Sequence, residues 1–388
     1  MRFRRLGAAG AVAALLLVAA CANDPAGTAT SEPSTTNPHA SHSGSAPPPS
    51  PLRQNERFVD IGLDKPYTPA APNGGTDEYR CFLIDPNLTE PAYLTGSRFL
   101  PQNAAIVHHA IFYRLGPEQA KSAEQTDAGT PGEGWTCFGD TGVDGQTAWV
   151  AHWAPGAGET LMPDGFGFEM PPGSKLVMQI HYNLLGAQGT GNADQSGMQM
   201  RLASAGAPLK PLETGLVMGP IELPCEPGGT GPLCDRETAV ADVAKRFGEE
   251  SRETVDQLVQ FCSGGRPKPG NTQTCDQPIE QAGTVYMAAG HMHLLGRAIK
   301  VELNPGTPKA QTIIDIPQYN FDDQALVPLK KPISIGKGDN IRVTCTHDAT
   351  LRQKLPQLKQ LPSRYVVWGE GTSDEMCLGI LVMAPATT

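Results

Sequence analysis

The sequence predicts an all-β protein for most of its 388 residues, and three observations carry that prediction. Glycine (43 residues) and proline (36) are abundant, whereas charged residues make up only 18% of the chain. Short apolar runs recur, each bounded by Gly, Pro, Asn or Asp, as is typical of strands. These runs are AAIVHHAIFYRL, KLVMQIHYNLL, AIKVEL, QTIIDI, NIRVTC and CLGILVM. Sandwiches or jelly rolls are the packing that such strands favour.

The N-terminus predicts export. Arg2, Arg4 and Arg5 precede an apolar run, Leu6–Ala20, that is too short to span a membrane as a mature helix, so residues 1–20 are predicted to be a signal peptide. The run closes as Val-Ala-Ala-Cys, which resembles a bacterial lipoprotein cleavage box. We therefore expect an exported protein at the cell surface or in the periplasm, held to the membrane only by a lipid on Cys21. The alternative is ordinary cleavage near Ala20 and secretion.

Residues 21–55 are predicted to be a flexible, lipid-anchored linker. They consist mostly of Pro, Ser, Thr, Gly and Ala and have almost nothing to bury, so they cannot offset the entropy of ordering. His39 and His42 lie in this linker, where we interpret them as incidental polar positions rather than as metal ligands.

The folded part is predicted to divide into domains at 56–207 and 208–388, because the Pro/Gly-rich stretch GAPLKPLETG lies about halfway along it. From Asp235 to Phe261 the apolar residues fall mostly three or four apart, which indicates one or two helices within an insertion at about 222–280. We interpret this insertion as a surface elaboration. It is flanked by cysteines, which are Cys225, Cys234, Cys262 and Cys275.

Charge and cysteine content limit the classes of function. A net charge of -10 without any basic run argues against nucleic acid as a partner. Eight cysteines remain after Cys21, an even number in an exported chain, so four disulfides are expected. Zinc is a competing use, but no CxxC or CxxH spacing supports it.

One histidine pair, in AAGHMHLLG, indicates a metal site. In a strand, His291 and His293 would point to the same face. Met376, in SDEMC, changes the meaning of this pair, because a thioether is a good ligand for Cu(I) and a poor one for zinc or magnesium. A disulfide between Cys345 and Cys377 is hypothesised to pin the segment that carries Met376.

A second cluster begins with the adjacent His108 and His109 in IVHHAIFY. Adjacent side chains in a regular strand point to opposite faces, so a shared metal needs a local distortion such as a bulge. His181 in KLVMQIHYN lies on the more polar side of its predicted strand and is the third candidate ligand. His152 and His347 have no partner at ligand spacing and are interpreted as structural or solvated.

The motifs IVHHAIFY, MQIHYN, GHMHLLG and SDEMC, in that order, resemble those of the copper type II, ascorbate-dependent monooxygenases. This family includes dopamine β-monooxygenase and peptidylglycine α-hydroxylating monooxygenase. The resemblance covers nearly all of the chain from about Phe58 to Met383, and the intervening WAPG, MPDG and GSKLVMQIHY segments also match.

The resemblance implies two consecutive jelly-roll-like antiparallel β-sandwich domains with one copper ion each, the two ions being separated by a solvent-filled cleft. His108, His109 and His181 would bind the electron-transfer copper; His291, His293 and Met376 would bind the copper that activates dioxygen. It also implies the reaction, in which a C–H bond of a small organic or peptide-like substrate is hydroxylated with dioxygen and with ascorbate or another one-electron reductant.

The chain departs from the family where peptidylglycine members bind the substrate carboxylate with arginine, asparagine and tyrosine. Ala289, Leu378 and Ile380 stand there, which disfavours peptides ending in glycine. The disulfide framework must also differ, and we predict a Cys81–Cys137 pair.

Two other functions share parts of this pattern. A non-catalytic copper-binding or carrier lipoprotein would need only one of the two sites. A zinc hydrolase built on the His291 pair would lack a carboxylate ligand or general base nearby and would leave Met376 unexplained.

Overall fold

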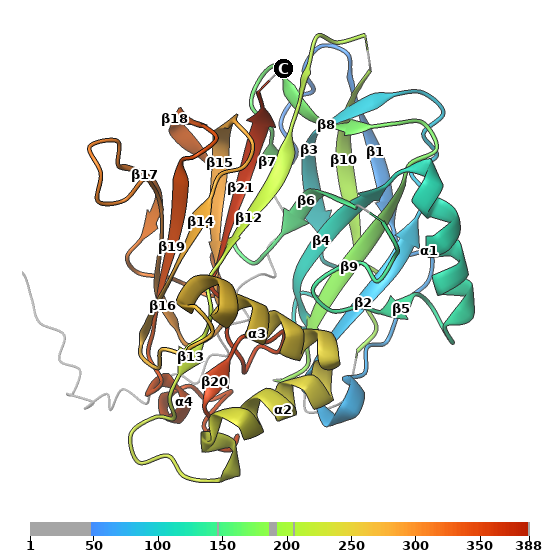
Figure 1. Ribbon diagram of the computed structural model, residues 1–388. Helices are drawn as coiled ribbons and strands as arrows, with labels where there is room; N and C mark the ends of the chain where they lie inside the picture. The colour runs from blue at the N-terminus through green and yellow to red at the C-terminus, as the bar shows by residue number, and fades with distance from the viewer. Residues whose placement is uncertain (1–47, 146, 186–191, 205, 387–388) are drawn as a thin grey trace, which may run out of the picture. The chain divides into compact units, whose positions relative to one another are not determined.

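A computed structural model describes residues 48–386, apart from 146, 186–191 and 205. The signal peptide, Cys21 and the linker up to residue 47 lie outside this part. The described chain is built mainly from antiparallel strands, which confirms the all-β prediction (Figure 1). At its start, the backbone carbonyls of Ser50 and Pro51 accept hydrogen bonds of 2.7 and 2.9 Å from the buried guanidinium of Arg201.

Two sheets form the first half of the described chain. One has the order β1-β10-β3-β8-β11, with β7 paired to β3, and the other has the order β5-β2-β9-β4-β6. All pairs are antiparallel except the short β8 and β11 pair. The strands are β1 (Glu56–Gly62), β2 (Asp77–Ile84), β3 (Ala92–Leu100), β4 (Val107–Leu115), β5 (Trp135–Thr136), β6 (Ala148–Trp153), β7 (Thr160–Leu161), β8 (Phe166–Met170), β9 (Lys175–Asn183), β10 (Gly197–Ser204) and β11 (Lys210–Pro211).

The second half contains two four-stranded sheets and one small pair. Their orders are β12-β21-β15-β18, β14-β19-β16-β17 and β13-β20. The strands are β12 (Glu213–Met218), β13 (Glu222–Leu223), β14 (Thr272–Pro278), β15 (Gly283–His291), β16 (Gly296–Leu303), β17 (Gln311–Ile316), β18 (Val327–Ile335), β19 (Asn340–His347), β20 (Val366–Val367) and β21 (Leu378–Pro385).

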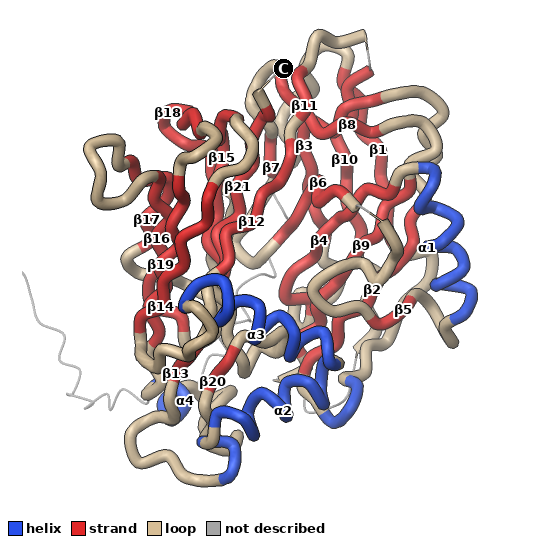
Figure 2. The backbone as a smooth tube through the Cα atoms, in the orientation of Figure 1, coloured by secondary structure: helices blue, strands red, loops and turns tan. Residues whose placement is uncertain are grey.

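The described helices are α1 (Pro117–Gly129), α2 (Arg236–Phe247), α3 (Glu249–Ser263) and α4 (Leu351–Lys354), drawn in blue in Figure 2. The predicted helical insertion is confirmed as α2 and α3. Gly248 separates these two helices at a φ of 94°, a conformation that favours glycine. The sequence did not predict α1. Its buried face consists of Ala120 and Ala123, which give no strong apolar periodicity.

Four disulfides join the eight cysteines that follow Cys21, as expected. The predicted pairs Cys81–Cys137 and Cys345–Cys377 are both confirmed. Cys225–Cys234 precedes α2, and Cys262–Cys275 ties the end of α3 to β14. Disulfides of this kind form in oxidising compartments, so the protein functions outside the cytoplasm, in the periplasm or extracellular space.

The two halves share apolar packing. Met287, Val382 and Ala384 of the second half belong to the same buried cluster as Phe112 and Ile180 of the first. Within the described residues, no helix has the length and apolar character needed to cross a bilayer.

Candidate metal centres and the pocket between them

Three imidazoles from β4 and β9 meet in the first half. These strands are antiparallel neighbours with His109 opposite His181, and the register shifts between Val107 and His109. This irregularity is the distortion that two adjacent histidines need in order to reach one site. The Nδ1 atom of His109 lies 3.2 Å from Nδ1 of His108 and 3.4 Å from Nδ1 of His181.

These separations fit a metal ion. Imidazole nitrogens bind such ions at about 2 Å, which places neighbouring ligand nitrogens roughly 3.3 to 3.5 Å apart around the ion. One ligand atom from each of the three histidines lies within 4.8 Å of the others, and all three side chains are buried. Burial, followed by the neighbouring His181 and His108, holds the pKa of His109 well below its ordinary value. This imidazole is therefore neutral, as a metal ligand must be.

His181 is oriented by groups that surround it. Its Nε2 donates a 2.9 Å hydrogen bond to Oδ1 of Asp77, at the start of β2, which leaves Nδ1 as the ligand atom. The ring of Tyr79 stacks on His181 at a centroid distance of 4.1 Å. Burial alone would raise the pKa of Asp77, but hydrogen bonds from His181 and Thr372 outweigh it and lower this pKa to about 2.

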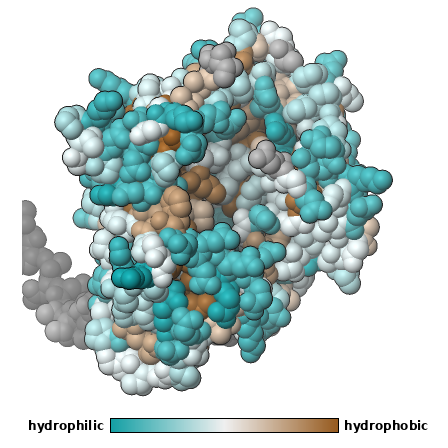
Figure 3. Space-filling view, in the orientation of Figure 1, coloured by the Kyte–Doolittle hydropathy of each residue, from teal (hydrophilic) through white to brown (hydrophobic). Residues whose placement is uncertain are grey.

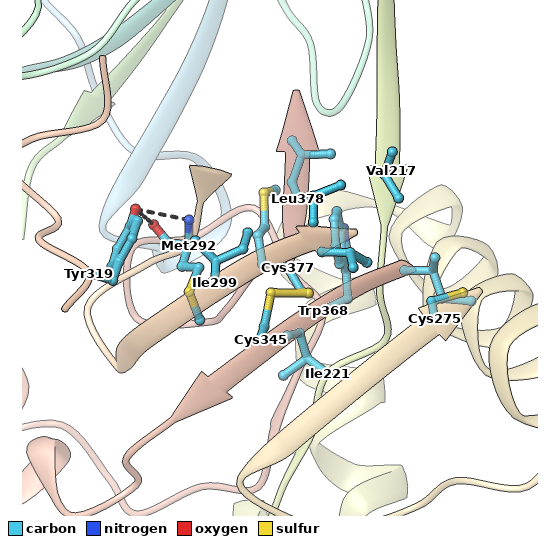
Figure 4. Close-up of a cluster of buried hydrophobic side chains, with 14 of the residues drawn as sticks. Val217, Ile221, Cys275, Met292, Ile299, Tyr319, Cys345, Trp368, Cys377 and Leu378 are labelled. Atoms are coloured by element: carbon cyan, nitrogen blue, oxygen red, sulfur yellow. Dashed lines mark hydrogen bonds between the residues drawn. A yellow bond between two sulfur atoms is a disulfide. The ribbon is translucent and has the colours of Figure 1, made fainter. Parts of the chain in front are cut away.

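In the second half, the pair His291 and His293 is not held by strand alternation as predicted. β15 ends at His291, and His293 follows it outside the strand. The turn is fixed instead by Met292, whose side chain is fully buried and whose backbone N–H and C=O both bond the hydroxyl of Tyr319, at 2.9 and 2.6 Å (Figure 4). The two imidazole rings are still neighbours, with centroids 5.2 Å apart.

The surroundings of this second pair leave ring nitrogens available to bind a ligand. Nδ1 of His291 lies 2.6 Å from Oε1 of Gln324, so this nitrogen is the donor and Nε2 keeps its lone pair. His293 is fully buried, and neither ring nitrogen has a hydrogen-bond partner among the described residues. Burial, then repulsion from His293, lowers the pKa of His291 to about 3; burial likewise lowers that of His293. A buried neutral imidazole without partners, beside a second one whose outer nitrogen is oriented by Gln324, fits a metal site.

Met376 lies two residues before β21 and is 7% exposed. The Cys345–Cys377 disulfide ties the residue beside it to β19, and Figure 4 shows this bond within the core. Met376 lines the same pocket as His291 and His109. The candidate ligands His109, His291 and Met376 thus offer nitrogen and thioether sulfur, a set that favours copper over zinc or magnesium.

The two histidine clusters adjoin each other, which corrects the separation expected from the family resemblance. The ring centroids of His109 and His291 are 5.6 Å apart. Phe321 lies between the clusters, stacked on His108 at 4.2 Å and edge-on to His293 at 6.4 Å. The physical reason is the apolar core that the two halves share, which packs the strands of one half against those of the other.

A cavity of about 480 Å³ opens beside the clusters. Its walls come from β4, β6, β12, α3 and the segment 368–380, and apolar side chains gather at the hollow near the centre of Figure 3. Five residues of α3 line it, so the insertion forms one wall of this cavity, a position that our interpretation of it as a surface elaboration did not anticipate. His152 also lines the cavity, and its buried Nε2 has no described partner.

The segment from Gly369 to Met376 is fixed from several sides. Asp374 accepts two hydrogen bonds of 2.7 Å from Arg246 of α2 and one of 2.8 Å from Arg364. Thr372 donates to Asp77, the partner of His181, through its hydroxyl (2.5 Å) and its backbone N–H (3.0 Å). Glu375 accepts hydrogen bonds from the backbone N–H groups of His293 and Leu295, at 2.9 and 2.6 Å. This segment thus contacts the partner of His181, the turn that carries His293, and the insertion.

The fold and these clusters define an all-β protein with two candidate metal centres beside one pocket. Residues 271–388 match the family model described as copper type II ascorbate-dependent monooxygenase, C-terminal domain. The family that the motifs predicted is therefore matched over this part of the chain. His291, His293 and Met376 lie within the matched part, whereas His108, His109 and His181 lie before it.

Solved structures show only remote similarity. The major capsid protein P2 of bacteriophage PM2 is 7% identical, with 85% of this chain and 98% of that chain covered and a TM-score of 0.29. The allantoicase of Saccharomyces cerevisiae is 12% identical, with coverages of 81% and 80% and a TM-score of 0.19. These TM-scores are too low to support any inference about the fold or function of this chain.

Sequence reasoning did not find the residues that orient the histidines. Asp77, Phe321, Gln324 and Glu375 all act through partners that are far away in sequence, so no local pattern marks them. His152 was visible as a histidine, but only the packing of β6 beside β4 places it in the pocket.

Proposed function

We propose that this protein is a copper-dependent monooxygenase. It hydroxylates a C–H bond of a small organic or peptide-like molecule, with dioxygen and with ascorbate or another one-electron reductant. His108, His109 and His181 hold the electron-transfer copper, and His291, His293 and Met376 hold the catalytic copper. Bound copper supplies one-electron chemistry and oxygen activation. A lipid at Cys21 anchors the exported protein.

The observation that carries this proposal is the meeting of both histidine clusters at one pocket. His109, His291 and Met376 line the same 480 Å³ cavity, so a substrate there would lie beside both candidate centres. The separation of 5.6 Å between the rings of His109 and His291 supports the movement of electrons between the centres without any large motion of the protein.

The chain's own residues prepare the pocket for this reaction. Asp77 and Gln324 each accept a hydrogen bond from one imidazole and thereby leave the opposite nitrogen free to bind metal. Trp149, Trp153 and Tyr113 line the cavity and supply apolar surface that would exclude water from a bound substrate.

A copper carrier remains the alternative, but the pocket argues against it, since storage needs no substrate cavity beside the ions. The structure also argues against a zinc hydrolase. Glu375 is the carboxylate near His293, and it is committed to two backbone N–H groups, so it is not free to act as a general base.

The test uses purified protein loaded with copper. We expect two copper ions per chain, ascorbate-dependent oxygen consumption with a suitable substrate, and a product heavier by one oxygen atom. Met376→Ala should abolish turnover while leaving the copper at His108, His109 and His181 in place. Full activity in that variant, or one copper that never turns over with ascorbate and a substrate panel, contradicts the proposal.

A further inference from the structure

The two groups that hold the imidazole of His181 are themselves held by the second half of the chain. Asp77 and Tyr79 lie two residues apart on β2 and so share one face of that strand, where Tyr79 is opposite His181 of β9. Asp77 accepts the hydrogen bond from His181, and Tyr79 stacks on its ring. Each of these two side chains also bonds the segment 370–372, which lies 295 and 291 positions later in the chain.

The carboxylate of Asp77 is the first point of contact. Its Oδ1 atom accepts the 2.9 Å hydrogen bond from Nε2 of His181. The same atom accepts two hydrogen bonds from Thr372, one from the hydroxyl at 2.5 Å and one from the backbone N–H at 3.0 Å. The Oδ2 atom accepts a hydrogen bond of 2.8 Å from the hydroxyl of Thr76. The two oxygens therefore have different partners, which fixes the rotation of this carboxylate relative to His181.

Burial makes each of these hydrogen bonds matter. Asp77, His181 and Thr372 are each no more than 1% exposed, so water does not readily replace a lost donor. Without the hydroxyl of Thr372, Oδ1 of Asp77 would keep two donors instead of three, and the carboxylate would be less restrained against turning toward Thr76. Such a turn would draw the Nε2 proton of His181, and with it the ring, out of position.

A second link runs through Tyr79. Its hydroxyl donates a 2.9 Å hydrogen bond to the backbone carbonyl of Glu370, while its ring lies nearly parallel to that of His181. The segment that provides these contacts is itself held, since Arg352 donates a 3.0 Å hydrogen bond to the backbone carbonyl of Ser373. The restraint on His181 therefore comes from a part of the second half that has defined contacts of its own.

We propose that Thr372 is a positioning residue of the first centre. Through Asp77 it holds His181 in the orientation that points Nδ1 toward the other two histidines. The second half of the chain thus completes a site whose three ligands all lie in the first half. Outer partners of this kind orient metal ligands and raise their affinity for the ion. The inference rests on the proposed copper at these histidines, but it concerns affinity and geometry and requires no turnover.

The test measures copper affinity and the electron paramagnetic resonance spectrum of Cu(II) in the full chain, without reductant or substrate. A background with His291→Ala and His293→Ala lacks the imidazoles of the second centre, so its bound copper reports on the first. In this background Thr372→Val removes the hydroxyl and keeps the shape of the side chain. We expect copper binding to weaken about threefold to tenfold in competition with a chelator, and the copper hyperfine coupling to change. This loss is smaller than that expected for Asp77→Asn, because Thr372 acts through Asp77.

Two variants separate positioning from general stability. Thr372→Ser keeps the hydroxyl and should bring copper affinity back to within about twofold of the background protein. Thr95→Val is the matched control. Thr95 is 2% exposed and donates a 2.7 Å hydrogen bond to the carboxylate of Glu56, but it lies on β3, in the sheet that does not carry the histidines. It should lower Tm and leave copper affinity and the spectrum unchanged.

Tyr79→Phe replaces the valine variant if Thr372→Val does not fold. It removes the hydroxyl that bonds the Glu370 carbonyl and keeps the ring that stacks on His181. We then expect copper binding to weaken about twofold to fivefold, and an unchanged affinity would overturn the inference.

The outcomes distinguish this inference from the proposed function. An unchanged affinity and spectrum in Thr372→Val, equal losses in Thr372→Val and Thr95→Val, or a Thr372→Ser protein that binds copper as weakly as the valine variant, each overturns the inference. A background protein that binds no copper at its three remaining site histidines refutes the proposed function, and the inference falls with it. Losses confined to the Thr372 hydroxyl, in a protein that consumes no oxygen, would keep the inference and refute the monooxygenase.

Discussion

Asp374→Asn tests whether the insertion holds the segment that carries Met376. Asp374 is buried and two residues before Met376, and it accepts hydrogen bonds from Arg246 of α2 and from Arg364. Burial would raise the pKa of Asp374, but the two guanidinium groups outweigh it and lower this pKa, so the carboxylate is ionised. Asparagine keeps the shape and removes the charge that both arginines face.

The expected loss of stability follows from this burial. Removing one partner of a buried ion pair costs about 3 to 5 kcal/mol. Asp242 remains as a partner of both arginines, through Arg246 Nε at 2.9 Å and through Arg364, so we expect the lower end, about 3 kcal/mol. With about 2.1 cal/mol/K of unfolding entropy per residue over roughly 340 residues, this corresponds to a fall in Tm of about 4 °C.

The assay compares Tm and copper binding with those of a matched control. Asp276 accepts two hydrogen bonds from Arg342, of 2.7 and 2.6 Å, but these side chains are 47% and 39% exposed. Asp276→Asn should therefore cost less than about 1 kcal/mol. X-ray absorption at the copper edge should show that Asp374→Asn, unlike the control, loses the copper–sulfur contribution of Met376 and keeps the nitrogen ligands of the first site.

Two results would refute this reasoning. Equal Tm changes in the two variants would mean that burial does not strengthen the Asp374 network. An undisturbed copper–sulfur signal in Asp374→Asn, despite a clear fall in Tm, would mean that the network stabilises α2 but does not position Met376.

Two further predictions concern carboxyl groups near the centres. Asp77→Asn removes the carboxylate that fixes the Nε2 proton of His181, so it should weaken copper binding at the first site about 10- to 100-fold, measured by competition with a chelator; an unchanged affinity would exclude this orienting role. Glu370 has a folded-state pKa of about 8 against an ordinary 4.5. Between these values the folded chain holds the extra proton, so stability should fall as pH rises, by up to about 1.4 kcal/mol per pH unit. Glu370→Gln should therefore be the more stable protein at pH 8, by about 4 kcal/mol, and within about 1 kcal/mol of the parent at pH 5. A difference in Tm between the two proteins that is the same at both pH values would contradict the buried state of Glu370.

The strands and the first histidine cluster were predictable because local patterns encode them. Alternation along β9 separates Met178, Ile180 and Tyr182, which enter the core, from His181, which faces the other side. The register shift at His109 was also foreseeable, since two adjacent side chains cannot otherwise reach one ion. The alternation and the register shift depend on residues within one or two positions of each other, whereas His109 and His181, which meet in the cluster, are 72 positions apart.

The features that were missed depend on distant partners. Arg246 and Asp374 are 128 positions apart, and Asp77 and Thr372 are 295 apart, so no window of sequence shows that they meet. The insertion was recognised as helical from its apolar spacing, but its function depends on which side chains its polar face meets. The adjacency of the two histidine clusters likewise follows from the shared core of the halves, and neither cluster's own sequence encodes it.

The segment GEGTSDEMC shows why residue type alone could not assign these roles. It contains three acidic residues within six positions, and each has a different state because each has different partners. Glu370 faces the pocket without a partner, and burial raises its pKa to about 8. Asp374 faces two guanidinium groups, which lower its pKa, and Glu375 accepts the backbone N–H groups of the turn that carries His293. Although all three lie on one short segment, their states are set by partners on three different parts of the fold, and the residue types along the segment do not distinguish them.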